Sequence, residues 1–151
     1  MILRMKTTWL IIIVLVIIAL SGAGLYAVTH PSCCMASKTT QAQIQPYQHV
    51  SPSDFNAALA SGKYKLIDVR TLQEYNAGHI KGASQADYYQ TKDFYAYLDN
   101  LNKNGNYLIY CRTGHRSEAV LQIMQEKGFT SVSDLDGGYN AWIGAGYPTV
   151  D

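Results

Sequence analysis

Two kinds of hydrophobic pattern divide this chain of 151 residues. Residues 9–28 form one continuous run without a charge, preceded by Arg4 and Lys6. After a polar stretch at residues 29–46, apolar positions return as short segments separated by glycines and polar turns. The pattern therefore predicts a membrane anchor or signal peptide at residues 1–28, a tether at 29–46 and a folded domain at 47–151.

The first hydrophobic run is long enough to cross a bilayer as a helix. Its basic flank predicts a cytoplasmic amino end, so we expect the domain on the extracytoplasmic side. Trp9 and Tyr26 resemble interfacial anchors and favour a span that is not cleaved. A cleaved signal peptide, giving a secreted or periplasmic protein, is the alternative, because residues 10–20 have signal-peptide length and Ser21-Gly22-Ala23 is an acceptable cleavage site.

Short apolar segments alternate with segments of helical periodicity through residues 47–151. Strands are predicted at residues 47–50, 64–69, 107–110 and 131–135. Helices are predicted from the start signal at residues 51–54 to Gly62, and at residues 72–77, 93–101, 117–127 and 139–143. This alternation implies an α/β domain with a central parallel sheet covered by helices on both faces. Ligands of such domains bind beyond the carboxyl ends of the strands.

Charge and cysteine content narrow the possible functions. Beyond residue 28 the chain holds 10 basic and 11 acidic residues, a net charge of −1. A nucleic-acid surface would show a basic excess, so we expect no nucleic-acid partner. The adjacent Cys33 and Cys34 fit a disulfide, acylation or no role. No Cys-x-x-Cys pair is present and the four histidines lack metal-ligand spacing, which argues against a zinc site.

The segment Cys111-Arg112-Thr113-Gly114-His115-Arg116-Ser117 lies between a predicted strand and a predicted helix. Loop amides and a helix N-terminus both stabilise an anion, and two arginines add formal charge. Such surroundings lower the pKa of a cysteine and produce the reactive thiolate. The same loop would hold a small oxyanion next to the sulfur, although free cysteines are also often buried for packing alone.

Three segments occur in a fixed order around this loop. They are Leu66-Ile67-Asp68-Val69-Arg70 continuing through Glu74-Tyr75 to Gly78-His79-Ile80-Lys81-Gly82-Ala83, then residues 111–117, then Leu135-Asp136-Gly137-Gly138-Tyr139-Asn140-Ala141-Trp142. Together, over about residues 47–148, they resemble the rhodanese family of sulfurtransferases. The resemblance implies a single α/β domain with a central parallel sheet and no metal or organic cofactor.

The resemblance also implies a reaction and its partners. Cys111 would take sulfane sulfur from a small anionic donor such as thiosulfate and become a persulfide. It would then pass that sulfur to cyanide, a thiol or a protein acceptor. The leaving sulfite is an anion, which suits positive surroundings.

Site residues follow from matching the loop to the family. Substrate binding is expected of Arg112, Thr113, Gly114, His115 and Arg116. The fork of Arg116 suits an oxyanion, although it could instead bridge an acidic side chain. Arg112 could equally be a solvated charge, and His115 has no matching role in the family, which favours a solvent-exposed side chain. Asp68 and Arg70 are expected to support the fold beneath the loop, and Ser117 to cap the following helix. Structural roles are expected for Glu74, His79, Gly137, Gly138 and Trp142.

Two other functions fit the same loop. One is a persulfide carrier or partner-binding module without efficient turnover. The other is a relative of phosphatases or arsenate reductases, which the loop length disfavours: the six positions from Cys111 to Arg116 match the single-domain sulfurtransferases, whereas the related phosphatases carry a longer loop.

Overall fold

The computed structural model of the protein describes residues 45–151. The predicted anchor or signal, most of the predicted tether, and Cys33 and Cys34 lie outside this range. Within residues 45–151, no helix combines the length and apolar character needed to cross a membrane. The membrane-related expectations concern the part of the chain before this range.

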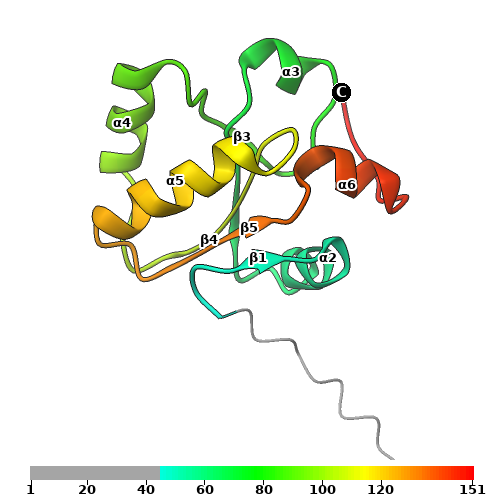
Figure 1. Ribbon diagram of the computed structural model, residues 1–151, viewed down its shortest axis with the longest axis horizontal. Helices are drawn as coiled ribbons and strands as arrows, with labels where there is room; N and C mark the ends of the chain where they lie inside the picture. Colours follow the sequence, from blue (N-terminus) through cyan, green and yellow to red (C-terminus); the bar gives the residue numbers. More distant parts are fainter. Residues whose placement is uncertain (1–44) are drawn as a thin grey trace, which may run out of the picture. The chain divides into compact units, whose positions relative to one another are not determined.

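Five parallel strands form one sheet in the order β1-β5-β4-β2-β3 (Figure 1). The strands are β1 (His49–Val50), β2 (Lys65–Asp68), β3 (Ser84–Gln85), β4 (Asn106–Tyr110) and β5 (Ser131–Leu135). The four predicted strands and the parallel α/β architecture are confirmed. The prediction omits β3, because its two residues have no apolar pattern and become a strand only by pairing with β2.

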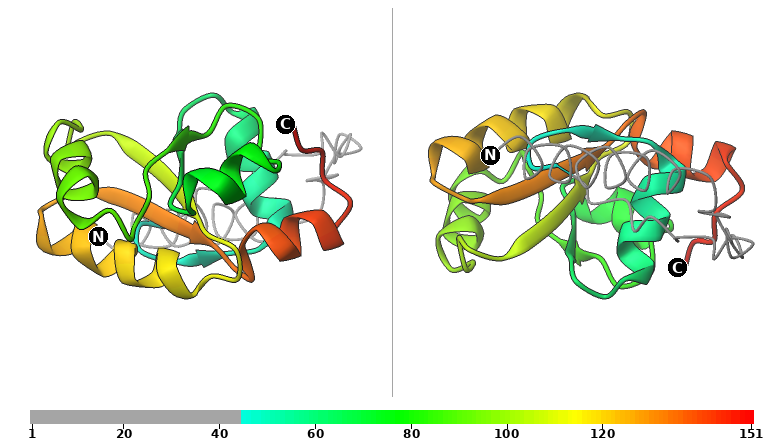
Figure 2. Two further views of the ribbon diagram at one scale, coloured as in Figure 1. Left: turned by 90° about the horizontal axis from the view of Figure 1, so that it is seen from above. Right: turned by 90° about the horizontal axis from the view of Figure 1, so that it is seen from below.

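Five helices connect these strands: α2 (Pro52–Ala60), α3 (Leu72–Asn76), α4 (Thr91–Asp99), α5 (His115–Glu126) and α6 (Gly138–Gly144). Helices α4 and α5 cover one face of the sheet, and α2 and α6 pack on the other (Figures 1 and 2). All five predicted helices are present. Helix α4 begins and ends two residues earlier than predicted, and α5 begins two residues earlier.

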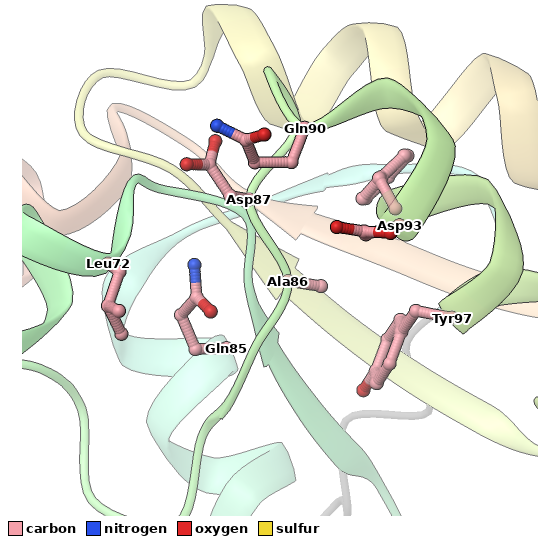
Figure 3. A pocket seen from close by; sticks show the side chains of 8 residues that line it. Leu72, Gln85, Ala86, Asp87, Gln90, Asp93 and Tyr97 are labelled. Carbon is pink, nitrogen blue, oxygen red and sulfur yellow. The ribbon is translucent and has the colours of Figure 1, made fainter.

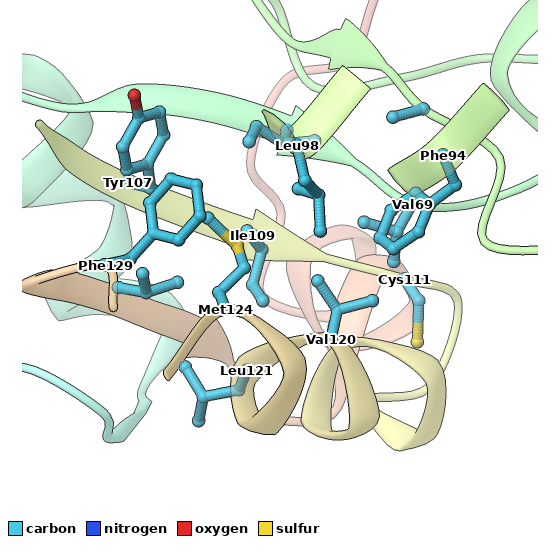
Figure 4. Close-up of a cluster of buried hydrophobic side chains, with 13 residues drawn as sticks. Val69, Phe94, Leu98, Tyr107, Ile109, Cys111, Val120, Leu121, Met124 and Phe129 are labelled. Carbon is cyan, nitrogen blue, oxygen red and sulfur yellow. The ribbon is translucent and has the colours of Figure 1, made fainter. Parts of the chain in front are cut away.

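The central strand β4 is buried on both faces of the sheet. Tyr107, Ile109 and Cys111 point to the cluster under α4 and α5 (Figure 4), whereas Leu108 and Tyr110 point to the opposite cluster. All five residues are at most 1% exposed. Each large apolar side chain buried in this way contributes about 1.5–3 kcal/mol. The central strand is therefore firmly held, and so is the point where the loop from Cys111 to Ser117 begins.

Candidate active site

Cys111 directly follows β4 at the carboxyl edge of the sheet and begins the loop to α5. The backbone N–H of Gly114 donates a hydrogen bond to its Sγ at 3.2 Å. The backbone N–H groups of Thr113, Arg116 and Ser117 also interact with the sulfur, and the Ser117 hydroxyl lies 3.7 Å from it. The loop therefore surrounds the sulfur with hydrogen-bond donors.

Two opposing effects set the pKa of the Cys111 thiol. Burial raises the pKa, because a thiolate loses its hydration in the interior. Hydrogen bonds from the N–H groups of Ser117 and Thr113, and then from the Ser117 hydroxyl and the Arg116 N–H, lower it. The net pKa lies below the ordinary value of a cysteine, so the residue is buried yet biased toward its nucleophilic form.

The N-cap of α5 is Gly114, so the predicted cap at Ser117 is wrong. Gly114 has φ 97°, a left-handed conformation that glycine adopts without a side-chain clash. Ser117 instead lies in the first helical turn, where its hydroxyl donates to the Gly114 carbonyl at 2.9 Å. Because no side chain caps this helix, its first N–H groups remain available to the sulfur.

The amino end of α6 holds the outer side of the loop. The N–H groups of Tyr139 and Asn140 donate to the carbonyls of Cys111 and Arg112 at 2.8 and 3.0 Å. A Cβ atom on Gly138 would lie only 2.6 Å from the Cys111 carbonyl oxygen, so this approach requires glycine. The structural role predicted for Gly138 is therefore confirmed: it lets α6 bind the loop carbonyls, which leaves the loop N–H groups facing the sulfur.

Arg116 lies at the mouth of the loop and forms a two-point ion pair with Glu74. Its Nη1 and Nη2 atoms each lie 2.8 Å from a carboxylate oxygen of Glu74. The hydrogen bond from Arg116 is the main cause that lowers the pKa of Glu74 to about 2. Two of the five guanidinium N–H donors make these bonds, so others remain for an anion. Contact between Arg116 and a substrate stays a prediction.

Glu74 is placed by the helix start that precedes it. The Thr71 side chain accepts from the Glu74 N–H, and Glu74 accepts from the Thr71 N–H, at 3.2 and 3.1 Å. This reciprocal capping box confirms a structural role for Glu74. The pattern Thr-x-x-Glu after a strand is a recognisable helix-start signal, but it does not indicate that the same carboxylate reaches Arg116, 42 residues later.

Asp68 and Arg70 form a second pair beneath the loop. The Arg70 side chain donates to Asp68 with distances of 2.7–3.0 Å, and its Nη2 also donates to the Gly78 carbonyl at 2.8 Å. The guanidinium carbon lies 4.0 Å from the centre of the Tyr139 ring. The pair therefore joins the end of β2 to α6, which confirms its predicted role as a support of the fold.

Two hollows flank the loop, one of about 380 Å³ beside Tyr89 and Arg116 and one of about 320 Å³ beside His49 and Asp134. The side chains of Arg112, Thr113 and His115 are exposed around them. A further hollow of about 480 Å³ lies near the start of α4 and contains no residue of the loop (Figure 3). Within residues 45–151, no three His, Cys, Asp or Glu side chains are grouped to hold a metal ion.

The pair formed by His49 and Asp134 was not identified from the sequence. Asp134 is fully buried on β5, and its Oδ1 lies 2.8 Å from Nδ1 of His49 on β1. At this distance the contact is an ion pair when the imidazole is protonated. Its other oxygen accepts from the Ser117 hydroxyl at 3.2 Å. No sequence pattern links the two residues, which meet because β1 and β5 pair in register.

The chain is similar to solved structures and known proteins along its folded part. A rhodanese-related protein from Thermoplasma volcanium superposes with a TM-score of 0.60 at 25% identity, over 69% of this chain and 98% of that chain. The rhodanese-like domain of an Anabaena protein gives 0.62 at 26% identity, over 71% and 80% of the two chains. These likenesses match the fold described above.

Two kinds of relative are similar in sequence. The thiosulfate sulfurtransferase GlpE of Pseudomonas entomophila is 31% identical over 96 residues, which are 64% of this chain and 84% of that protein. The tRNA uridine(34) hydroxylase of Chlamydia caviae is 31% identical over 121 residues, but this chain spans only 35% of its length. The family model for the rhodanese-like domain matches residues 51–145, so the chain belongs to the family of rhodanese-like domains.

Proposed function

We propose that the protein is a sulfurtransferase that carries sulfane sulfur on Cys111. The observation that supports this most directly is the set of backbone N–H donors around Cys111 Sγ, next to the Arg116 guanidinium. These groups stabilise a thiolate, and they suit an anionic persulfide formed at the same place. The similarity to a thiosulfate sulfurtransferase over 84% of its length supports the same activity.

With thiosulfate as donor, the Cys111 thiolate attacks the outer sulfur and forms a new sulfur–sulfur bond. The bond between the two sulfur atoms of thiosulfate breaks, and sulfite leaves with the electron pair. Cyanide or an acceptor thiolate then attacks the terminal sulfur of the persulfide, and the Cys111 thiolate is released. The sulfur atoms at the loop carry negative charge in each step, so the backbone N–H donors can stabilise every species formed there.

The donor reaches a sulfur that is almost covered, since Cys111 is only 1% exposed. The hollow beside Tyr89 and Arg116 offers an approach from the side of the loop where the guanidinium lies. The Arg116 side chain is 13% exposed, so its free N–H donors can meet an incoming anion. We propose this as the donor entrance.

A phosphatase activity is a further competing function, which ranks below the persulfide carrier. A solved protein from Rhodopseudomonas palustris, described as a possible tyrosine phosphatase, has a similar fold at 23% identity, which indicates the fold alone. The six positions from Cys111 to Arg116 form a loop shorter than that of the related phosphatases. We therefore expect sulfur transfer from thiosulfate and no release of phosphate from an aryl phosphate.

The decisive experiment is intact mass spectrometry of the full chain after treatment with thiosulfate. One added sulfur atom should appear on Cys111 and disappear on addition of cyanide. Cys111→Ser should prevent both the added mass and thiocyanate formation, whereas the matched control Cys33→Ser/Cys34→Ser should retain both. Undiminished transfer by Cys111→Ser would contradict the mechanism. Loading without turnover to any acceptor would indicate a persulfide carrier.

We also propose that residues 9–28 anchor the protein in a membrane with the domain on the extracytoplasmic side. The support is the sequence alone: the uncharged run and the basic flank of Arg4 and Lys6. Sequencing the mature amino end and washing membranes with carbonate separate an anchor from a cleaved signal. A reporter fused after Asp151 that is active only in the cytoplasm would contradict the proposed orientation.

A further inference from the structure

A row of three polar side chains connects the protein surface with Cys111. His49 has a side chain that is 54% exposed, and its Nδ1 lies 2.8 Å from Oδ1 of Asp134. Asp134 is fully buried, and its Oδ2 accepts from the Ser117 hydroxyl at 3.2 Å. The same hydroxyl lies 3.7 Å from Cys111 Sγ. These contacts connect an exposed imidazole, a buried carboxylate and the Cys111 thiol in one continuous series.

The Ser117 hydroxyl has one proton but three nearby acceptors. They are the Gly114 carbonyl at 2.9 Å, the Asp134 carboxylate at 3.2 Å and the sulfur at 3.7 Å. A charged carboxylate attracts this proton more strongly than a neutral group does. The charge of Asp134 therefore competes with the sulfur for the one hydroxyl donor that touches both.

Asp134 also acts on the sulfur through its field. Because the two contacts of Ser117 are 3.2 and 3.7 Å, Asp134 Oδ2 lies within about 7 Å of Cys111 Sγ. At that distance in a protein interior, an unpaired carboxylate opposes formation of the thiolate. Burial raises the pKa of Asp134, against the opposing influence of His49 and Ser117, which shows that its charge depends on its partners.

We propose that His49 and Asp134 are positioning residues for the reactive thiol: the His49 cation neutralises Asp134 and so keeps Cys111 in its thiolate form. Without a positive charge at His49, the buried carboxylate stands uncompensated, holds the Ser117 hydroxyl and repels the thiolate. Thiol reactivity is thereby linked to a residue outside the loop, through the contacts of Asp134 and Ser117. The inference deepens the proposed function and rests on it for its biological meaning.

Other charged groups face this pair. Glu118 of α5 and Asp136 after β5 line the same hollow as His49 and Asp134, and so does His115. All three are unchanged in the variants below, so differences between those variants report on the pair itself.

The test is the rate of alkylation of Cys111 by iodoacetamide as a function of pH, followed by mass spectrometry on the full chain. His49→Gln should move the midpoint of the profile up by about one pH unit, because Asp134 loses its counter-charge. Asp134→Asn should move the midpoint down, because the carboxylate is gone and the Ser117 hydroxyl is released. The double variant should behave like Asp134→Asn alone, since His49 acts through Asp134.

Lys127→Gln is the matched control. Lys127 forms an ion pair with Asp99 at 2.6 Å near the far end of α5, roughly 15 Å along the helix from Ser117. Its loss should leave the midpoint unchanged. An unchanged midpoint in His49→Gln, whose side chain is largely exposed and whose loss spares the core, would overturn the proposal even if Asp134→Asn failed to fold. A further upward shift by His49→Gln in the Asp134→Asn background would also overturn it.

Alkylation uses no sulfur donor, so this test is independent of sulfur transfer. Failure of thiosulfate loading with the predicted midpoint shifts would contradict the proposed function and leave the link between His49 and the thiol intact. Normal loading of Cys111 by thiosulfate, without any shift of the alkylation midpoint, would support the proposed function and contradict the link between His49 and the thiol.

Discussion

Two arginine–carboxylate pairs lie near Cys111, and they differ in what surrounds them. In the pair beneath the loop, the Arg70 and Asp68 side chains are 4% and 0% exposed. In the pair at the mouth, the Arg116 and Glu74 side chains are 13% and 26% exposed. Both pairs are bidentate, so the clearest difference between them is their exposure to solvent.

In the buried pair, the Arg70 side chain is fully engaged in contacts within the protein. Arg70 donates to Asp68 and to the Gly78 carbonyl, and it stacks against Tyr139. A buried charge that loses its partner is expensive, so such a pair is held in place by its surroundings. In the mouth pair, Arg116 is bonded to Glu74 at a partly exposed position, where the proposed function requires it to meet an anionic substrate. If Arg116 binds substrate as proposed, solvent access distinguishes it from the supporting Arg70.

The largest effect should come from Asp68→Asn. This change keeps the side-chain volume but leaves the Arg70 charge buried without a counter-charge. The free energy of unfolding should fall by about 3–5 kcal/mol, as found when one partner of a buried pair is removed. Urea denaturation measures this loss. A decrease below about 1 kcal/mol would place the pair among ordinary surface contacts and remove the contrast with the mouth pair.

Arg116→Lys tests the mouth pair through activity. Lysine keeps the charge but loses the two-point geometry, so kcat/KM with thiosulfate should fall about tenfold or more, equivalent to about 1.4 kcal/mol. Glu74→Gln is the matched control, because it also breaks the ion pair but retains the guanidinium. If both variants lose activity equally, and the double variant loses no more, Arg116 serves only Glu74 and the substrate role is wrong.

The aromatic partners of the two arginines provide a smaller contrast. The Arg70 guanidinium lies 4.0 Å from the ring centre of Tyr139, whereas that of Arg116 lies 5.4 Å from the ring centre of Tyr89, a residue that is 62% exposed. Tyr139→Leu should lower the free energy of unfolding by about 1 kcal/mol, and Tyr89→Leu by less than half as much. Equal losses in thermal or urea unfolding would show that burial does not distinguish the two contacts.

The smallest effect concerns how the free energy of unfolding changes at acidic pH. The pKa of Glu74 is lowered from 4.5 to about 2, mainly by its hydrogen bond with Arg116. A lowered carboxylate pKa stabilises the fold above the unfolded-state value, and this contribution is lost as pH falls from about 5 to about 2. Partial exposure to solvent limits the loss to less than about 1 kcal/mol. The difference in unfolding free energy between the wild type and Glu74→Gln should therefore narrow over this range; a constant difference would contradict the assignment.

Hydrophobic pattern and local motifs determined the α/β architecture, because both are readable within one segment. The apolar run Tyr107-Leu108-Ile109-Tyr110 predicts a strand, and the glycine and basic residues after it predict the anion-stabilising loop at Cys111. One local prediction at the site was wrong: Ser117 was expected to cap α5, whose N-cap is Gly114. The helix starts earlier, after Gly114 in a left-handed conformation. The sequence does not reveal this start, because glycine permits such a conformation but does not require it.

The tertiary structure alone decided which distant side chains share the site. Glu74 reaches Arg116 across 42 residues, and Asp134 meets both His49 and Ser117, because parallel pairing brings separate strand ends to one edge of the sheet. The two-residue strand β3 likewise exists only through its pairing with β2. Sequence patterns report on neighbours along the chain, whereas the charges that tune a buried thiol act through space, between residues whose separation in sequence carries no signal.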